Sequence, residues 1–197
     1  EVKKLRMLFR GTGATVVWFY APGYIGQQKF EPSQMEALTG FTFKRMDARG
    51  PMMIRCKIEE NGLKFFREFG VQKPQYPRFA VVPRKSETFR IHGTWSDSQE
   101  IAFASREYDG FTSIYVGTGP MPVELLRWIA GRAGVSLWSS KPDNVRATKD
   151  AAMIVATDEG ERVLRLPHPM ASVGGGAATT EHKLSMQFGE VKLFVKG

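Results

Sequence analysis

Cys56 is the one thiol of this 197-residue chain, and its position decides whether thiol chemistry is available. A nucleophilic cysteine needs an exposed, tight strand-to-helix turn and a histidine partner that activates the thiolate. Cys56 lies instead in residues 52–58, where the apolar residues at 52, 54, 56 and 58 share one face of a predicted strand. Cys56 is therefore predicted to be a small core residue, and one cysteine excludes an internal disulfide and a multi-cysteine zinc site.

Two pairs of adjacent carboxylates, Glu59-Glu60 and Asp158-Glu159, are candidates for acid–base chemistry. Hydrolysis by two carboxyl groups requires them to converge at about 5 Å on rigid elements. Both pairs stand near a glycine, Gly62 and Gly160, in turn-like segments. Solvated acidic turns are the better interpretation, and no catalytic residue is predicted.

The three histidines, His92, His168 and His182, are too far apart in sequence to form a close ligand pair. Each is predicted to be a surface or turn residue, so no metal site is expected. The glycine-rich stretches 11–13 and 174–176 do not match a nucleotide-binding fingerprint, because the first precedes a strand and the second is not followed by a helix. No cofactor is expected.

Aromatic residues at the end of an apolar run are the remaining candidates for a binding site. Residues 14–20 (ATVVWFY) predict a strand covered on both faces, which is typical of the centre of an α/β sheet. Ligands gather at the carboxyl ends of such strands, and aromatic faces suit sugar rings, so Trp18, Tyr20 and Tyr24 are candidate sugar-contacting residues. The alternative, which the apolar run favours, is that Trp18 and Tyr20 belong to the core.

Three helices are predicted around these strands. Val2, Leu5, Leu8 and Phe9 recur at helical spacing. A second helix follows Ser33 and stops at Gly40, with Ser33 and Glu36 matching a capping box. The third is amphipathic and ends before Gly134; its apolar face is predicted to hold Val123, Leu126, Ile129, Ala130 and Ala133.

Strands are predicted at 41–47, 52–58, 79–82 and 88–92, whereas 63–69 reads as a brief helix or a loop and 72–78 as a proline-rich connection. The segments 101–108 and 111–117 flank Asp109-Gly110, a dipeptide typical of a tight type I′ hairpin turn. After residue 140 the texture changes to short β-like runs at 151–156, 162–166, 183–188 and 191–195. We expect an α/β domain over residues 1–140 and a small all-β, sandwich-like domain over 141–197.

The charge of the chain is unevenly distributed. Residues 1–100 hold 17 Lys and Arg against 10 Asp and Glu, out of 28 and 20 in the whole chain. The basic residues are spread singly between apolar ones and no nucleic-acid motif accompanies them, so strands with a solvated face explain them better than a polyanion site. No membrane span or signal peptide is visible. The sequence begins with Glu1, so a processed or excised piece is an open interpretation and the cellular compartment stays open.

Two stretches resemble a known family. Residues 13–25 (GATVVWFYAPGYI) and 109–135 (DGFTSIYVGTGPMPVELLRWIAGRAGV) are similar to the C-terminal part of large β-galactosidase-like glycoside hydrolases. Residues 162–173 (RVLRLPHPMASV) and 189–195 (GEVKLFV) resemble the small β domain that closes those proteins. The resemblance implies a flavodoxin-like, class I glutamine-amidotransferase-like α/β sheet with flanking helices, related to the trimerisation domain of family 42 β-galactosidases. The family's α/β domain normally opens with a further strand that this chain lacks, so the domain is expected to be truncated at its N-terminus.

The family's catalytic (β/α)8 barrel is absent too, since a barrel takes about 250 residues. The resemblance therefore implies a non-catalytic C-terminal region that supports subunit or interdomain assembly beside a barrel, and by analogy an oligomer such as a trimer. Two alternatives stay open: part of an active glycosidase that lends loop residues to sugar binding, and a stand-alone carbohydrate-binding or polyanion-binding module.

Overall fold

Strands dominate the structure. The computed structural model describes residues 2–25, 30, 32–60, 62–84 and 88–196. Within these residues the chain forms thirteen strands and three helices, and it divides into two units, residues 1–125 and 126–197. The helices are α1 (Val2–Phe9), α2 (Ser33–Thr39) and α3 (Val123–Arg132). No helix of the described part has the length and apolar character needed to cross a bilayer.

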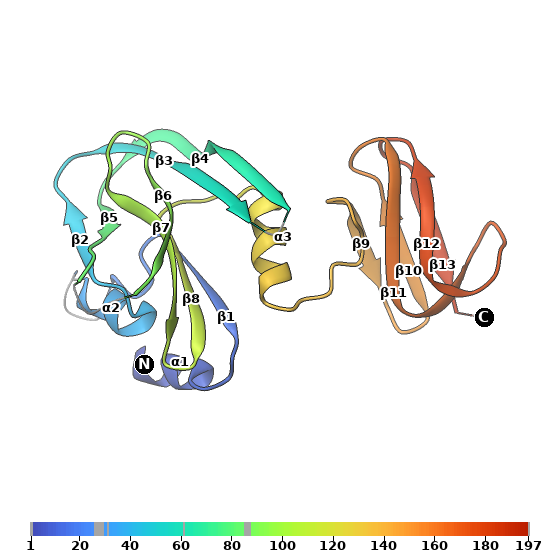
Figure 1. Ribbon diagram of the computed structural model, residues 1–197, viewed down its shortest axis with the longest axis horizontal. Helices are drawn as coiled ribbons and strands as arrows, with labels where there is room; N and C mark the ends of the chain where they lie inside the picture. The colour runs from blue at the N-terminus through green and yellow to red at the C-terminus, as the bar shows by residue number, and fades with distance from the viewer. Residues whose placement is uncertain (1, 26–29, 31, 61, 85–87, 197) are drawn as a thin grey trace. The chain divides into compact units, whose positions relative to one another are not determined.

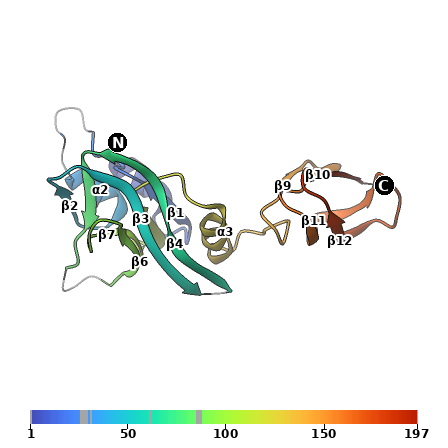
Figure 2. The ribbon, with the colours of Figure 1, turned by 90° about the horizontal axis from the view of Figure 1, so that it is seen from above.

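The first unit is built on an eight-stranded sheet (Figure 1). Its strands are β1 (Thr15–Phe19), β2 (Phe43–Met46), β3 (Gly50–Glu60), β4 (Leu63–Gln75), β5 (Arg78–Val81), β6 (Arg90–Trp95), β7 (Ile101–Tyr108) and β8 (Phe111–Val116). Six strands follow the order β1-β8-β7-β6-β3-β4, while β5 joins β2 to β7. Figure 2 shows the long β3–β4 hairpin bent along its length. Only β1 and β8 pair in parallel among the described strands.

The fold is predominantly β with a curled, mixed sheet, and it is not the clear α/β flavodoxin-like sheet that was predicted. The apolar run at residues 14–20 does form a strand, but β1 ends the sheet order instead of lying at its centre. Within β1 only Trp18 is buried, and Phe19 is 44% exposed. A strand can be continuously apolar because helices and loops cover it or because it lies at the centre of a sheet. The apolar pattern therefore could not predict the position of this strand in the sheet.

The hairpin between β7 and β8 is confirmed. Asp109 and Gly110 have φ angles of 55° and 79°, the two positive values that a type I′ turn requires. Arg6 Nε donates to the Asp109 carboxylate at 2.9 Å, which ties α1 to this turn. The turn was predicted from the two residues that form it, and the structure has the turn at that place.

The prediction for residues 63–69 is wrong, because they belong to β4, which is the longest strand of this unit. Gly70 and Pro74 interrupt the apolar pattern, yet both lie inside the strand. Gly70 has a φ of 121°, and a Cβ there would lie 2.1 Å from the Met52 carbonyl oxygen on β3. Glycine is what allows the two strands to approach at this point.

The helices differ from expectation in detail. Leu5 and Leu8 of α1 are exposed, while Val2 and Phe9 pack on the core. Helix α2 has no side-chain cap hydrogen bond, and Glu36 accepts instead from the Phe43 amide at 3.1 Å. The buried face of α3 is not the predicted one: it holds Leu125, Trp128 and Ile129, whereas Val123 and Leu126 are 44% and 45% exposed.

The second unit is an all-β module. Its strands are β9 (Asn144–Ala147), β10 (Ala151–Val155), β11 (Gly160–Ser172), β12 (Thr179–Met186) and β13 (Val191–Val195). They form one antiparallel sheet in the order β12-β11-β13-β10-β9. The sequence predicted four of these strands and missed β9. Phe194, Leu164 and Ile154 are fully buried in its core.

Candidate functional site

Trp18 faces inward from β1. Its side chain is 8% exposed, and its indole nitrogen donates to Ser113 Oγ at 3.1 Å. The Phe9 ring meets the Trp18 ring edge-on at 6.1 Å. The indole N–H therefore already has a partner, and Trp18 acts as a link between α1 and the sheet.

Tyr20 follows β1 and is held by its backbone and its hydroxyl. Its φ of 60° is unusual for a residue other than glycine. The Tyr20 amide donates to the Val116 carbonyl at 2.8 Å, and the Tyr20 hydroxyl donates to the Pro77 carbonyl at 2.9 Å. Burial raises the pKa of Tyr20. The residue is still 37% exposed, so part of its ring faces solvent in a fixed orientation.

Tyr24 is buried against Phe79, with 4.7 Å between the ring centroids, and its ring also lies 5.9 Å from that of the exposed Phe30. The Tyr24 hydroxyl has a partner as well. That oxygen accepts from Arg45 Nη1 at 3.5 Å. The Arg45 guanidinium also lies over the ring of Tyr76, 5.9 Å from the centroid. Tyr76 is 43% exposed, and Arg45 is exposed on β2 and makes no ion pair among the described residues. We call Tyr20, Tyr24, Arg45 and Tyr76 the tyrosine–arginine cluster.

The cluster joins two sequence-predicted residues to two that sequence reasoning missed. Arg45 and Tyr76 are brought together because β2 pairs with β5, with Arg45 opposite Phe79. Tyr76 lay in the segment predicted to be a proline-rich connection. A local sequence pattern does not predict which strands pair when about thirty residues separate them. Exposed aromatic faces beside a guanidinium can stack on a ligand and donate hydrogen bonds to it.

Cys56 is confirmed as a core residue. Its side chain is 2% exposed on β3, on the same face as Met52, Ile54 and Ile58. Burial raises the pKa of the Cys56 thiol to about 12. At neutral pH the group is a thiol, which is a poor nucleophile.

The prediction for His92 is wrong, because it lies within β6 and is 7% exposed. Its Nε2 lies 2.7 Å from Ser105 Oγ, and its ring is 4.9 Å from Phe103. His182 lies in β12 instead of a loop, with its ring 4.5 Å from Phe194. His168 is exposed on β11, as a surface residue would be.

The paired carboxylates face cations. Glu59 lies 2.9 Å from Lys64, and Glu60 lies 3.3 Å from Arg90. Asp158 accepts from Lys141 Nζ at 3.0 Å. In the part of the chain that the structure describes, His, Cys, Asp and Glu form no group of three that could hold a metal ion.

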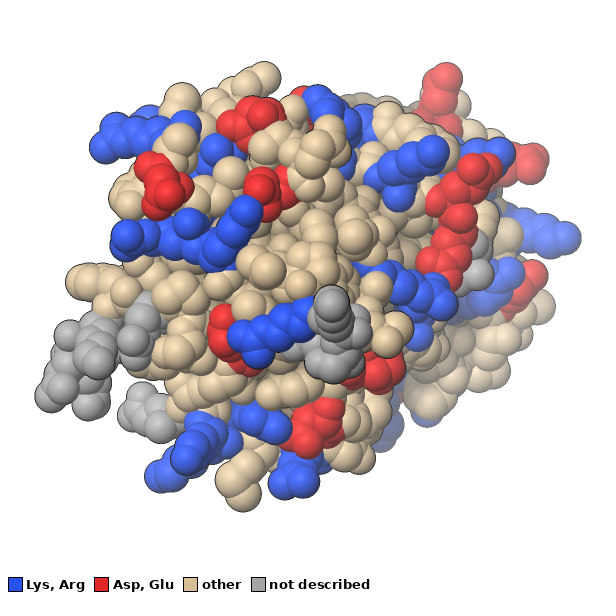
Figure 3. All heavy atoms as spheres, turned by 60° about the vertical axis from the view of Figure 1, so that its left-hand side comes forward, with Lys and Arg blue, Asp and Glu red and all other residues tan. Residues whose placement is uncertain are grey.

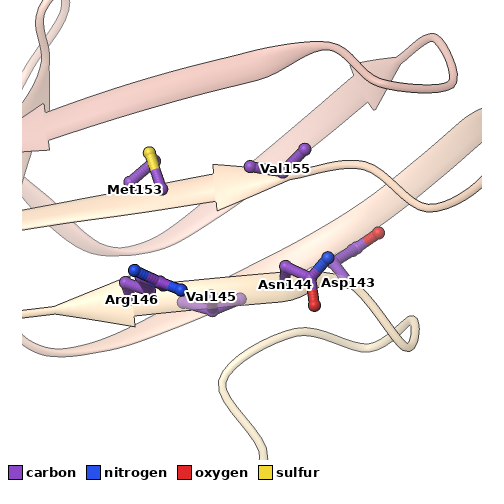
Figure 4. A pocket seen from close by; sticks show the side chains of 6 residues that line it. All are labelled: Asp143, Asn144, Val145, Arg146, Met153 and Val155. Atoms are coloured by element: carbon purple, nitrogen blue, oxygen red, sulfur yellow. The ribbon is translucent and has the colours of Figure 1, made fainter.

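A pocket lies on the second unit, over β9 and β10. Figure 4 shows its lining, which consists of Asp143, Asn144, Val145, Arg146, Met153 and Val155. Arg146 is opposite Met153 in the strand register, and it makes no ion pair with a described residue. The Asp143 carboxylate is already used, since it accepts from Ser139 Oγ and from the Thr157 amide. The pocket thus offers apolar contact and one available cation.

The pocket continues into an exposed apolar surface. Val191, Leu193 and Val195 lie on the outer side of β13 and are 51%, 48% and 42% exposed. Val191 and Leu193 are opposite Val155 and Met153 of β10. Val173, 60% exposed, donates its amide to the Leu193 carbonyl. We call Met153, Val155, Val173, Val191, Leu193 and Val195 the apolar sheet face; contiguous surfaces of this kind mark interaction sites.

Charges of both signs are mixed on the face of the molecule that Figure 3 shows. Figure 3 shows Lys and Arg side chains interspersed with Asp and Glu on one side of the molecule. Many of these charges pair across strands, as Lys44 does with Glu100 at 2.6 Å and Arg55 with Glu68 at 3.2 Å. The surplus of basic residues is thus partly neutralised locally.

Solved structures similar to this chain are β-galactosidases. The β-galactosidase from Bacillus circulans sp. alkalophilus matches with a TM-score of 0.58 and 12% identity, over 100% of this chain and 31% of its own. A catalytic mutant of Gan42B, a GH42 β-galactosidase from G. stearothermophilus, matches with a TM-score of 0.53 and 13% identity, over 99% and 29%. The polyextremophilic β-galactosidase from the Antarctic haloarchaeon Halorubrum lacusprofundi matches with a TM-score of 0.54 and 12% identity, over 99% of this chain and 29% of its own.

No family model matches the sequence, and no curated protein does. The similarity to the β-galactosidases is therefore a similarity of fold. This chain spans less than a third of the length of each of these enzymes. The resemblance that the sequence suggested is thus matched at the level of the fold.

Proposed function

We propose that this chain is the non-catalytic C-terminal region of a β-galactosidase-like glycoside hydrolase and that it packs beside a catalytic barrel or another subunit. The observation that carries the proposal is the match of 99–100% of the chain to 29–31% of β-galactosidase chains. The correspondence to a minor part of larger enzymes supports a packing partner for this chain. In this proposal residues 1–140 are the assembly domain of the family, and residues 141–197 are its closing β domain.

The apolar sheet face is the surface that suits such packing. Leu193 and Val195 are nearly half exposed, although aliphatic side chains of this size gain about 1.5–3 kcal/mol each from burial. Arg146 lies at the margin of this face without an ion pair among the described residues. We therefore expect the barrel to present apolar side chains here and a carboxylate opposite Arg146.

The experiment is co-expression of this chain with the (β/α)8 barrel encoded in the same protein or operon. The two should co-purify and sediment as one complex, and Leu193→Lys should weaken the complex by about tenfold or more. Phe188→Lys is the matched control, since Phe188 is an exposed apolar residue of the second unit that lies outside the apolar sheet face. If no barrel is encoded there, or if barrel and chain sediment separately, the proposal fails.

A second candidate function is carbohydrate contact at the end of β1, through Trp18, Tyr20 and Tyr24. The observation that favours it is the tyrosine–arginine cluster, which holds two partly exposed rings next to the exposed Arg45 guanidinium. Calorimetric titration with galacto-oligosaccharides tests it, with Tyr76→Ala and Arg45→Ala as variants. Binding heat that both variants abolish supports the site, and heat that neither changes removes it.

A further inference from the structure

We propose that the free edge of β12 pairs with the same edge of a second copy of this chain, in an antiparallel arrangement whose two-fold axis passes through His182. Strand β12 is eight residues long and pairs with β11 alone among the described strands. Such an edge presents unpaired N–H and C=O groups to a further strand. The pairing would extend the five-stranded sheet of the second unit across a dimer.

The backbone direction of β12 determines which residues can pair across this edge. On β11, the Val163 carbonyl accepts from the Ser140 amide and the Arg165 amide donates to the Trp138 carbonyl, so the residues opposite Lys183 and Glu181 direct their backbone groups away from β12. In an antiparallel ladder the amide and carbonyl of alternate residues point to opposite sides, so the odd-numbered residues direct their backbone groups outward. Hydrogen-bonded pairing with a second copy must therefore match odd residues with odd residues.

Side-chain direction adds a second condition. The even residues His182, Leu184 and Met186 turn toward the core, where the His182 ring lies 4.5 Å from Phe194. Glu181 and Lys183 are exposed on the opposite face. The charges of two paired copies would thus meet on the solvent side of the joined sheet.

Among the registers that match odd residues with odd residues, the one centred on His182 gives the best charge complementarity. With His182 opposite His182 of the second copy, Glu181 faces Lys183 and Lys183 faces Glu181, so two oppositely charged pairs form. The outer pairs are Thr179 with Ser185, which are both polar. A shift of the axis to Glu181 or to Lys183 places like charges opposite each other and is disfavoured. The edge is therefore complementary to itself in charge and in hydrogen-bond direction.

The test is sedimentation equilibrium of the full chain, whose monomer mass is 22.1 kDa. We expect a dimer, and Lys183→Glu should raise its dissociation constant by about tenfold or more, because it turns both attractive pairs repulsive. Lys196→Glu makes the same change of charge at an exposed position outside β12 and should leave the dimer unchanged.

Lys183→Pro provides an independent variant. Its missing N–H points outward, so the monomer should keep its circular dichroism spectrum, whereas the pairing is interrupted at its centre. A wild-type chain that stays monomeric up to millimolar concentration overturns the proposal. So does a dimer that Lys183→Glu and Lys183→Pro leave intact while both remain folded.

Discussion

The Arg162 guanidinium donates to the Asp143 carboxylate inside the second unit, and both side chains are fully buried. Arg162 also donates to the carbonyls of Asp158 and Gly160. The pair ties β11 to the segment that precedes β9, in a module of only about seventy residues. Removing Asp143 leaves the buried Arg162 guanidinium with the half-exposed Asp158 carboxylate, 3.3 Å away, as its remaining anionic partner, so most of the compensation for its charge is lost.

Asp143→Ala should therefore destabilise the second unit by about 3–5 kcal/mol. The measurement is urea unfolding followed by a probe specific to that unit, such as Trp138 fluorescence in a variant whose other tryptophans are replaced. Glu161→Ala is the control, because Glu161 is an exposed carboxylate on the adjacent residue of β11. Equal stability of the two variants would show that the buried pair contributes nothing.

A second ion pair predicts how the stability of the first unit depends on pH. Arg78 is 2% exposed and binds both Asp97 carboxylate oxygens, at 2.8 and 2.9 Å. The hydrogen bonds from Arg78 lower the pKa of Asp97 below its ordinary value. A lowered pKa means that this stabilisation is present above the unfolded-state pKa, near 3.9, and is lost as the pH falls through the folded-state value.

Asp97→Asn should accordingly lower the free energy of unfolding at pH 7 and flatten its decline between about pH 5 and pH 2. Denaturant titrations at a series of pH values measure this difference. Asp47→Asn, at an exposed position, serves as the comparison. Parallel pH curves for wild type and Asp97→Asn would contradict the assignment.

Replacing two glycines by alanine should change the stability of the protein in opposite directions. Gly110 has a φ of 79°, and a Cβ there would lie 2.7 Å from the Gly11 Cα, so Gly110→Ala should cost more than about 1 kcal/mol. Gly131 lies inside α3 with open space around the position of a Cβ. Gly131→Ala should stabilise the protein by about 0.5–1 kcal/mol. Thermal unfolding of both variants checks the two signs.

The buried Cys56 thiol should react slowly with thiol reagents in the native protein. Its pKa of about 12 and its 2% exposure leave almost no accessible thiolate at pH 8. A chromogenic disulfide reagent should react with it only on the timescale of unfolding, and at once in denaturant. Rapid stoichiometric reaction of the native protein would contradict its place in the core.

Local patterns were the part of this structure that the sequence could predict. Asp109-Gly110 specifies a turn through its own backbone preferences, and the alternation around Cys56 reports one buried face. Strand β4 was missed because Gly70 and Pro74 are breakers in most contexts, and only the pairing with β3 makes them acceptable.

Long-range relationships were beyond such patterns. The edge position of β1 depends on which strands pair, and a run of apolar residues carries no information on that. Two side-chain contacts likewise form only when the strands have paired: that of Arg45 with Tyr76 and that of Arg162 with Asp143. Trp18, Tyr20 and Tyr24 were proposed from their place at the end of an apolar run, and that run does not predict the different environment of each side chain.

The most direct measurement of the central claim is hydrolysis of a chromogenic galactoside by the purified chain alone and by the chain bound to its barrel. The account predicts no turnover above buffer for the isolated chain and activity for the complex. Sustained turnover by this polypeptide alone, in proportion to its concentration and abolished by a substitution within it, would contradict the account.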